Sequence, residues 1–571
     1  MARAVASPLR VASLLLLVAA AVESDACLSR LLGPPAPERR PAPLVFAPTR
    51  DSDAWVTASF HVQRAYARVL AVSAGPAPPR VRVRRLDLDA RAPGEASELA
   101  VELSFHTLQE AADAARGGDL VAVLPGRYRG FVLGDKPDAG DGRYVRFTTT
   151  GAPGQVTIDR PAQADGDRWM ILLQAAHHVV VEGFEIAGQA DGPWAGIMLD
   201  GDFGRSGKLT HHVAVVGNFS HHHRNWGLHS TDTHTVLLQD NLFALSAREH
   251  SAYVSDGSDD YVIRRNVFFG SRDGGLQCNL DPEASFEEIL KHPALAGYPR
   301  SDGTRAWAAG LLRRAAELFG DNGFPDGRGI HFIIEENVIN GNGRGGGGAL
   351  NLAGLSDSLI QNNLLYGNLA HGIAQWDNDN PYDADAVAHG PQTPEGFAGP
   401  ASLPLFGCHG NVIRNNTVIM ANADRAAFQA IHGSFGSVVY NNVLINDEPS
   451  SFEVSSTAVY GLDAGSNVLN TVRYTEGAER LAALAVAFPE GARTTTGVTR
   501  ARFAAEVRRY GDAPWVQLTD HWWRLDPERP DFHPLPGSTL LAGRADPRQL
   551  PGVDLDGDPR GSADIGALVA R

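Results

Sequence analysis

The chain has 571 residues, enough for several domains or for one elongated repeat domain. Its formal net charge of -16 at pH 7 argues against nucleic acid or an anionic membrane surface as a partner, because like charges repel. Only three cysteines are present, so we expect no disulfide framework. The 61 glycines and frequent Asn-rich turns favour short strands joined by tight corners.

Residues 1–21 have the layout of a secretory signal peptide. Arg3 and Arg10 precede an apolar run over residues 11–22 that ends in small side chains. The run is shorter than the ~20 apolar residues of a spanning helix, and no later run is longer. We therefore expect a secreted or cell-surface protein without a transmembrane segment. Cys27 follows, in a polar context that matches a lipid attachment site poorly.

Two different segments precede the main part of the chain. Residues 22–100 contain the Pro-rich stretch "LLGPPAPERRPAP" and the alternating stretch "WVTASFHVQ", which predict a linker and a small β element. The stretch "FHTLQEAADAARGGDLVAVLPGRYRG" then predicts an amphipathic helix, a Gly-Gly stop, a strand and a Pro-Gly turn. The apolar side of that helix carries Leu108, Ala111, Ala112 and Ala115.

One phrase recurs along the chain: an apolar pair, two polar residues ending in Asn, and a further apolar stretch. Its asparagines are Asn218, Asn241, Asn266, Asn337, Asn363, Asn416 and Asn442. Most are roughly 25 residues apart, and inserted loops account for the longer intervals. The repeat predicts a coil that returns to the same place every turn, with the asparagines stacked in a structural hydrogen-bonded ladder.

A second phrase precedes each asparagine, with variants such as "GIMLDGD", "GLHSTDT" and "SAYVSDG". Its second residue is always apolar: Ile197, Leu228, Ala252, Leu276, Ala349, Ile373 and Phe428. Since neighbouring side chains on a strand point to opposite faces, we expect these residues to point inward. The third and fifth residues then point outward: Met198 and Asp200, His229 and Thr231, Tyr253 and Ser255, Gln277 and Asn279, Leu350 and Leu352, and Ala374 and Trp376.

With these phrases the chain resembles the right-handed parallel β-helix proteins related to pectate lyases, of secreted bacterial type, over about residues 105–472. The resemblance implies an all-β solenoid over residues 101–475, with the amphipathic helix plugging its open end. Residues 476–571 would be a C-terminal capping region, because "PGSTLLAG", "DLDGDPRG" and "ADIGAL" are similar to the tail of such proteins. The scaffold carries lyases, hydrolases, epimerases and non-catalytic proteins, so it does not define a function.

Two insertions interrupt the repeat, at about residues 282–330 and 377–407. The first has apolar residues at helical spacing that we expect to pack rather than to bind a ligand: Trp307, Leu311, Leu312, Ala315, Leu318 and Phe319. Both insertions follow the second phrase. We therefore expect them to rise beside the outer face of those strands and either to form the wall of a groove or to cover that face.

The outward positions of four consecutive coils are unusually polar. Stacking predicts one column of His229, Tyr253 and Gln277, and a second of Asp200, Thr231, Ser255 and Asn279. The corners before these strands add His221, His222, His223, Arg224, Arg248, Glu249, His250, Arg272 and Asp273. A solvated sheet face would carry Ser, Thr, Lys and Glu more often than His, Tyr and Arg, so the surface is a candidate site.

Elimination from a uronic-acid glycan needs a base and a cation beside the sugar carboxylate. The candidate bases are His229, His250 and Tyr253, and the candidate charge stabilisers are Arg224, Arg248 and Arg272. Asp200, Gln277, Asn279, Arg272 and Trp376 are candidate substrate-binding residues, the last by stacking on a sugar. The resemblance implies a lysine or arginine base with calcium, as in many β-helix lyases. These strands carry no lysine, so the sequence departs from that pattern.

Glycoside hydrolysis is an alternative chemistry that needs two carboxylates. Asp232 and Asp256 occupy equivalent corners on neighbouring coils, so a close pair could divide the acid and base roles. Aspartates at corners also serve to accept backbone hydrogen bonds, which is the structural alternative for both.

Metal binding is left open by the sequence. The stretches "SDGSDD", "DNDNPYDADA" and "DLDGDPRG" offer oxygen ligands that suit calcium, although turn geometry explains them equally well. The histidines at 211–212 and 221–223 would suit zinc, but adjacent strand residues are expected to point to opposite faces, which argues against a zinc site.

The sequence thus predicts a monomeric, exported β-helix protein that acts on polysaccharide, by β-elimination at the surface around His229 and Tyr253. The first alternative is a non-catalytic cell-surface or glycan-binding protein with the same fold. The second is a glycoside hydrolase that uses Asp232 and Asp256.

Overall fold

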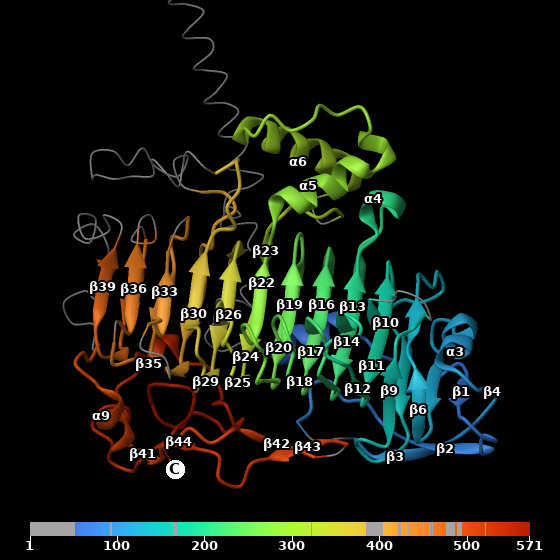
Figure 1. Cartoon of the computed structure of the whole chain (residues 1–571), viewed down its shortest axis with the longest axis horizontal. Coiled ribbons are helices and arrows are strands. Elements are labelled where there is room, and N and C mark those ends of the chain that lie inside the picture. Colours follow the sequence, from blue (N-terminus) through green and yellow to red (C-terminus); the bar gives the residue numbers. More distant parts are fainter. Residues whose placement is uncertain are drawn as a thin grey trace, which may run out of the picture.

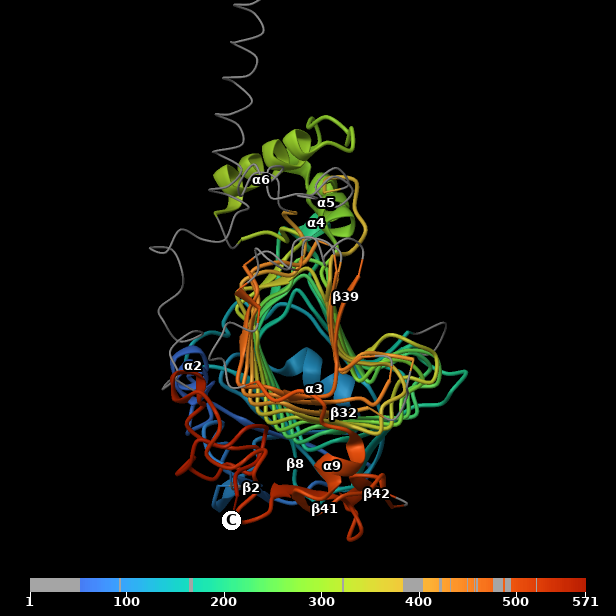
Figure 2. The ribbon, with the colours of Figure 1, turned by 90° about the vertical axis from the view of Figure 1, so that its left-hand side faces the viewer.

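The computed structural model describes residues 52–570, except 92–93, 164–167, 321–322, 384–403, 421–423, 432, 449, 456–457, 459–460, 476–485, 488–493 and 520. The predicted signal peptide and Cys27 lie outside the described residues. Within them the chain winds into a right-handed parallel β-helix of triangular cross-section, as Figure 2 shows end-on, so the predicted fold class is confirmed. No described helix is long and apolar enough to cross a membrane.

Three parallel sheets form the sides of the coil, and each turn of the chain adds one strand to each of them. The front sheet faces the viewer in Figure 1 and consists of β7 (Phe131–Leu133), β10 (Trp169–Gln174), β13 (Ala195–Asp200), β16 (Trp226–Thr231), β19 (Ala252–Ser255), β22 (Leu276–Asn279), β26 (Gly348–Ala353), β30 (His371–Trp376), β33 (Phe428–Ala430), β36 (Phe452–Ser455) and β39 (Val472–Thr475).

The back sheet follows the front sheet in each turn. It consists of β1 (Val69–Val72), β4 (Leu103–Phe105), β5 (Leu120–Val123), β8 (Val145–Thr149), β11 (His177–Glu182), β14 (Thr210–Val216), β17 (Thr233–Gln239), β20 (Asp259–Arg264), β24 (Ile333–Glu335), β28 (Leu359–Gln361), β31 (Val412–Arg414), β34 (Val438–Tyr440), β37 (Asp463–Gly465) and β40 (Val486–Ala487). Since β1 pairs with β5, residues before 101 already take part in the coil.

The lower sheet completes each turn. It consists of β6 (Gly126–Arg129), β9 (Val156–Arg160), β12 (Glu185–Ala187), β15 (Phe219–His221), β18 (Leu242–Ala244), β21 (Val267–Phe269), β25 (Val338–Asn340), β29 (Leu364–Tyr366), β32 (Thr417–Ile419), β35 (Val443–Ile445) and β38 (Val468–Leu469). The remaining described strands pair outside the coil: β2 (Arg80–Arg84) with β3 (Ala96–Ala100), β23 (Gly329–Ile330) with β27 (Leu355–Ser356), β41 (Val507–Arg509) with β44 (Asp531–Pro534), and β42 (Val516–Leu518) with β43 (Trp523–Leu525).

A single apolar column fills the interior of the coil, as strand alternation requires. The residues expected to point inward, from Ile197 to Phe428, all belong to this core. One coil differs from the expectation. Leu350, not Ala349, pairs with Leu276, so Leu350 and Leu352 point inward and Asn351 points outward. The expectation that both leucines lie on the outer face was therefore wrong by one residue.

The predicted asparagine ladder runs along the turn between the back and lower sheets. Asn218 Nδ2 donates to Asn241 Oδ1 over 3.1 Å, and the same bond continues from each asparagine to the next. The long interval between Asn266 and Asn337 is a single turn, with the insertion looped out. Asn467, which the repeat phrase did not include, extends the ladder by one more turn.

Helices cover the first end and the upper edge of the coil (Figure 1). At the first end α3 (Leu108–Ala114) buries Leu108, Ala111 and Ala112 in the core, and its Thr107–Glu110 capping box fixes its start. The other helices are α2 (Ser52–Ser59), α4 (Phe203–Ser206), α5 (Pro282–Lys291), α6 (Arg305–Phe319) and α9 (Arg500–Ala504), with short 3-10 turns at Pro293–Leu295 and Pro547–Gln549.

The first insertion forms α5 and α6 above the upper edge of the front sheet (Figure 1). Trp307, Leu311, Leu312 and Ala315 are buried in a separate cluster with Phe286 of α5. Leu318 is 38% exposed, so one of the six residues expected to pack does not. Most of the second insertion lies outside the described residues.

The described part of the C-terminal region lies along the outer face of the lower sheet (Figure 1). Phe532, Leu541 and Ile565 pack there against outward lower-sheet residues such as Leu242 and Leu364. Burial of apolar surface therefore attaches this region along the length of the coil.

Candidate functional site

The outer face of the front sheet carries both polar columns that the sequence predicts. Strand register pairs Met198 with His229, His229 with Tyr253, and Tyr253 with Gln277. It likewise aligns the second column, which consists of Gln174, Asp200, Thr231, Ser255, Asn279, Ala353 and Trp376. Side chains that are far apart in the sequence therefore share one surface.

Aromatic rings surround His229 and Tyr253. Trp226 stacks on Tyr253 with ring centres 5.5 Å apart and lies 4.4 Å from the His229 ring. His250 also stacks on Tyr253, at 5.7 Å. Trp169 lies 6.2 Å from His229. The rings hold His229 and Tyr253 in a half-buried apolar setting on an otherwise polar face.

The sequence prediction included Trp376 but not the three tryptophans near His229. Trp169 and Trp226 occupy one register position at the start of β10 and β16, and Trp194 directly precedes β13. The guanidinium group of Arg168 lies over the Trp194 ring, 4.4 Å from its centre. A tryptophan at the beginning of three successive front strands was the signal that could have revealed this cluster.

Burial keeps the candidate bases uncharged at neutral pH. It lowers the pKa of His229 to about 4 and the pKa of His250 to about 4. Burial first, and the negative charge of Asp256 second, raise the pKa of Tyr253. At pH 7 these groups are two neutral imidazoles and a protonated phenol, which are the forms that a general base and a general acid require.

Hydrogen bonds separate the roles of the two histidines. His250 Nδ1 accepts from the Gly274 backbone N–H over 2.9 Å, and His250 is only 8% exposed. His229 Nε2 lies 3.3 Å from Ser255 Oγ, whereas its Nδ1 has no hydrogen-bond partner among the described residues. His229 Nδ1 is thus an uncommitted but buried ring nitrogen, whereas His250 commits its Nδ1 to the backbone and supports Tyr253 by stacking.

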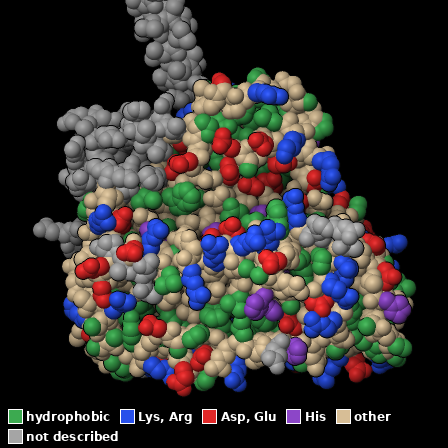
Figure 3. All heavy atoms as spheres, viewed as in Figure 1, with side chains coloured by type: hydrophobic (Ala, Val, Ile, Leu, Met, Phe, Trp, Pro, Cys, Tyr) green, Lys and Arg blue, Asp and Glu red, His purple; other side chains and the backbone are tan. Residues whose placement is uncertain are grey.

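A row of arginines follows the lower edge of this face. We call them the corner arginines: Arg224, Arg248, Arg272, Arg344 and Arg425, each a few residues before the front strand of its coil. Neighbouring corners are hydrogen-bonded, because the Arg272 N–H donates to Ser246 O and the Gly345 N–H donates to Arg272 O. Figure 3 shows a band of Lys and Arg side chains below a hollow of the front face, with the insertion helices above it.

Most corner arginines lack a direct ion-pair partner among the described residues. Arg224, Arg272 and Arg344 form no ion pair within the part of the chain that the structure describes. Arg248 lies 3.6 Å from Asp191, and both side chains are exposed, so this pair contributes little. The sequence prediction included Arg224, Arg248 and Arg272 but not Arg344 and Arg425, because it stopped at the fourth coil.

Two predicted substrate-binding residues are held by other side chains. Trp376 Nε1 donates to Asn351 Oδ1 over 2.9 Å, and Asn351 Nδ2 donates to Gln277 Oε1. Gln277 is 4% exposed. This network closes the face beyond Tyr253, so Gln277 and Trp376 contact one another through Asn351 rather than projecting into solvent.

The predicted carboxylate pair lies at the upper edge, under α5, in an acidic pocket of about 260 Å³ that contains Asp200, Asp202, Asp232, Asp256, Glu287 and Glu288. Burial raises the pKa of Asp200 to about 6 and the pKa of Asp256 to about 6. Burial and the neighbouring Asp256 raise the pKa of Asp232 as well. Asp232 is 2% exposed and accepts the Gly257 backbone N–H, so it has little contact with solvent.

In the described parts of the predicted calcium motifs, the aspartates accept backbone hydrogen bonds. Asp259 accepts the Ile330 N–H, and Asp554 accepts the backbone N–H groups of Asp556 and Asp558. Glu249, His250 and Asp273 form a group that could hold a metal ion. Two carboxylates are fewer oxygen ligands than Ca²⁺ takes, so this group does not fit calcium, whereas the acidic pocket offers enough carboxylates.

The histidines at 221–223 do not form a joint site with the front face. His223 is fully buried, and its Nε2 lies 2.9 Å from Ser220 Oγ. His221 belongs to the lower sheet, beside Glu185, and His222 is exposed.

No known protein-family profile matches the chain, and no curated protein is similar to it in sequence. Among solved structures the chain is similar to pectate lyase Pel9A, with 12% identity, a TM-score of 0.36, and coverage of 63% of this chain and 74% of that chain. It is also similar to an alginate lyase from Paenibacillus sp. str. FPU-7, with 12% identity, a TM-score of 0.34, and coverage of 63% and 95%. The Azotobacter vinelandii mannuronan C-5 epimerase AlgE4 A-module gives 14% identity, a TM-score of 0.33, and coverage of 64% and 89%. At these values the likeness says nothing about activity, which depends on the side chains described above.

Proposed function

We propose that the protein is an exported polysaccharide lyase that cleaves an anionic, uronic-acid-containing glycan at the front face. The observation that carries the proposal is the row of corner arginines beside an uncharged His229 and Tyr253. A polyanionic chain laid along the row would meet one cation on each of the four successive coils from β16 to β26, at the strand spacing of about 4.8 Å. A neutral glycan would gain nothing from that row.

The chemistry assigns one role to each group. His229 takes the proton at C5 of a uronic acid residue, and the electron pair forms the C4–C5 double bond as the C4–O bond breaks. The Tyr253 hydroxyl group donates its proton to the departing glycosidic oxygen. Arg224 and Arg248 lie at the corners of the coils that hold His229 and Tyr253 and would stabilise the charge that develops on the uronate carboxylate.

The remaining predicted residues have supporting roles. Arg272 would bind a neighbouring uronate, and Asp200 and Asn279 would contact sugar hydroxyl groups along the second column. Gln277 and Trp376 would fix the shape of the face through their bonds to Asn351. His250 would hold the Tyr253 ring. None of these steps requires a metal ion or a cofactor.

Specific features of the front face and of the acidic pocket distinguish the two alternative functions from the lyase. A glycan-binding protein without catalysis would use the tryptophans and the corner arginines but would not need His229 to be neutral. Hydrolysis by Asp232 and Asp256 requires both groups to reach water, and Asp232 is 2% exposed. Elimination is therefore the better supported chemistry.

The proposal is tested by incubating the purified protein with polyuronates, such as alginate and polygalacturonate, and with neutral glucans as controls. We expect ultraviolet absorbance from unsaturated chain ends together with new reducing ends, on polyuronates only. Reducing ends without absorbance would indicate hydrolysis. Binding to polyuronates without either product would leave the non-catalytic alternative and refute the lyase.

A further inference from the structure

A histidine ladder lies on the other side of the upper edge, at the start of the back-sheet strands β11, β14 and β17. It consists of His177, His178, His211, His212 and His234. The rings of His177 and His211 are stacked with centres 5.1 Å apart, and those of His211 and His234 with centres 4.8 Å apart. His178 and His212 form a second stack, at 4.5 Å. Five imidazoles thus lie on three successive coils.

Backbone conformation brings the adjacent histidines together. His178 and His212 have φ angles of 53° and 52°, in the left-handed region, so the strand alternation does not apply to them. As a result the Nδ1 atoms of His177 and His178 are 3.0 Å apart, and those of His211 and His212 are 2.8 Å apart. The expectation that adjacent histidines point to opposite faces was wrong for His211 and His212.

The outer nitrogens of the first pair face carboxylates. His177 Nε2 lies 3.0 Å from Asp135 Oδ1, and His178 Nε2 lies 3.4 Å from Asp141 Oδ1. These contacts hold the two rings from outside and leave their Nδ1 atoms facing one another.

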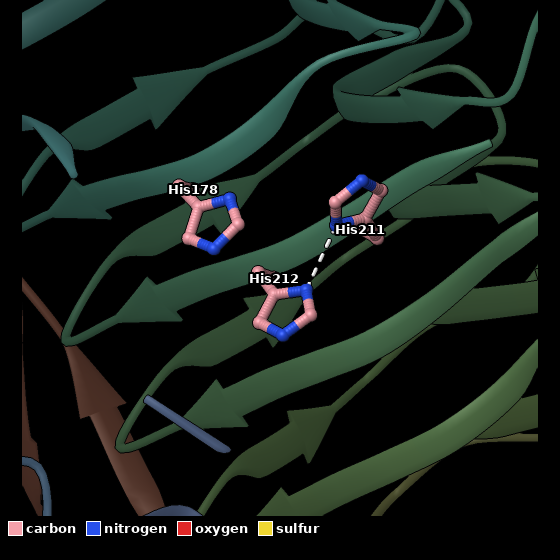
Figure 4. A group of neighbouring side chains, drawn as sticks. All are labelled: His178, His211 and His212. Atoms are coloured by element: carbon pink, nitrogen blue, oxygen red, sulfur yellow. Dashed lines mark hydrogen bonds between the residues drawn. The ribbon is translucent and has the colours of Figure 1, made fainter. Parts of the chain in front are cut away.

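We propose that this ladder binds a divalent transition-metal ion of the zinc type. His178, His211 and His212 each place a ring nitrogen within 4.8 Å of those of the other two, as Figure 4 shows, and a small rotation would bring them onto one ion. His177 or His234 would supply a fourth nitrogen, which completes the tetrahedral set that Zn²⁺ prefers. An all-imidazole set selects such a metal over Ca²⁺ and Mg²⁺, which take oxygen ligands.

The surroundings suit such a site. Asp135 and Asp141 would orient the outer nitrogens of His177 and His178, as carboxylates commonly do for metal-bound histidines. A cavity of about 440 Å³, lined by Asp135, His177, Lys208, His211 and His234, lies in front of the ladder and gives an ion a path from solvent. The site is separate from His229 and Tyr253 and does not depend on the proposed lyase activity.

The chain provides a matched control. His221 and His222 show the same Nδ1 contact, at 2.7 Å, and His222 also has a left-handed backbone. However, the neighbouring coils place Ala187 and Ala244 beside His221, so this pair has no stacked imidazoles. The double variant H221Q/H222Q therefore removes a histidine pair without touching the ladder.

The test uses the untagged full chain, stripped with a chelator and titrated with Zn²⁺ by calorimetry. We expect one tightly bound Zn²⁺ per chain in the wild type and in H221Q/H222Q, and binding weaker by more than about 100-fold in H211Q/H212Q. Asp135→Asn and Asp141→Asn should each weaken binding by about 10–100-fold. Cu²⁺ loaded in place of Zn²⁺ should show several nitrogen couplings in its electron paramagnetic resonance spectrum.

Circular dichroism spectra recorded in the presence of chelator check that each variant folds. The spectra of all variants should resemble that of the wild type. Zn²⁺ should then raise the unfolding temperature of the wild type and of H221Q/H222Q but not of H211Q/H212Q. Absence of tight Zn²⁺ binding in the wild type, or equal binding in H211Q/H212Q, would overturn the proposal. In either case the ladder would be a proton-sharing stack without a metal.

Discussion

His229 and Tyr253 lie side by side on β16 and β19, with ring centres 5.1 Å apart and ring planes inclined by 63°, although a complete turn of the coil separates them in the sequence. Strand register fixes this relationship, so in the proposed reaction both side chains would approach one sugar from the same face of the sheet. A base and an acid held in this way need no movement of the scaffold to act together.

Tyr253→Phe should remove the acid and leave the stacked ring. We expect kcat on the best polyuronate to fall by about 10²–10⁴-fold with little change in KM, because proton donation matters in the transition state and not in binding. Tyr440→Phe, on the back sheet, removes another buried hydroxyl group and should leave kcat unchanged. Equal rates for Tyr253→Phe and the wild type would remove Tyr253 from the mechanism.

The pH profile should report His229. Its pKa of about 4 means that the base is neutral, and therefore active, above about pH 5 and becomes protonated as the pH falls through 4. We expect kcat/KM to be flat from weakly acidic to neutral pH and to fall tenfold per pH unit below 4. His229→Gln should abolish the activity, whereas His221→Gln should keep both the activity and the profile. A fall in kcat/KM near pH 6.5 instead would point to a different, solvent-exposed histidine as the base.

The corner arginines should control the affinity for anionic chains. Arg344→Ala lies two coils beyond Tyr253, so we expect KM to rise several-fold with kcat nearly unchanged, and the dependence of KM on salt to weaken. Arg314→Ala on α6, whose side chain pairs with Glu317, removes a charge away from the row and should have no such effect. An unchanged KM for Arg344→Ala would limit substrate contact to the first three corner arginines.

The sequence predicted the features that repeat and missed those that depend on local backbone. Asn218 and its counterparts recur at the same place in every copy of the phrase, so their ladder was visible. Leu350 was misplaced because the glycines at 345–348 do not mark where β26 begins. The side on which His178 and His212 lie depends on a left-handed backbone that no residue in the pattern signals. The tryptophans precede the repeat phrase, and the burial of Asp232 was not predicted because α5, which covers its pocket, comes from an insertion.

The asparagine ladder should be a major source of stability. Asn266 Nδ2 donates to Asn337 Oδ1, and Asn266 Oδ1 accepts from the backbone and side chain of Asn241. Asn266→Ala leaves several buried groups unpaired, and each costs about 1–3 kcal/mol, so we expect a loss of at least 2 kcal/mol or so. Asn225→Ala, at a half-buried corner, should cost much less. Similar urea midpoints for the two variants would contradict a structural role of the ladder.

The acidic pocket should make the fold less stable as the pH rises. The pKa of Asp256 is about 6 in the folded chain against a model-peptide value of 3.8, so the folded state holds its proton more tightly than the unfolded state does. Stability therefore falls as the pH rises from about 4 to about 6, and the penalty is complete above that range. Asp256→Asn should remove this penalty. The free energy of unfolding should rise by at most about 3 kcal/mol at neutral pH and by almost nothing near pH 4.

Thermal unfolding at several pH values measures this gain, and Asp302→Asn provides the comparison of opposite sign. Hydrogen bonds from Thr304 lower the pKa of Asp302, which lies on the exposed N-terminal side of α6, so its ionised form stabilises the fold. Asp302→Asn should therefore give no gain at neutral pH. A gain for Asp256→Asn that did not grow between pH 4 and pH 7 would mean that the carboxylate is already neutralised, by a neighbouring cation or a bound metal ion, and that the pocket does not carry the charge assigned to it.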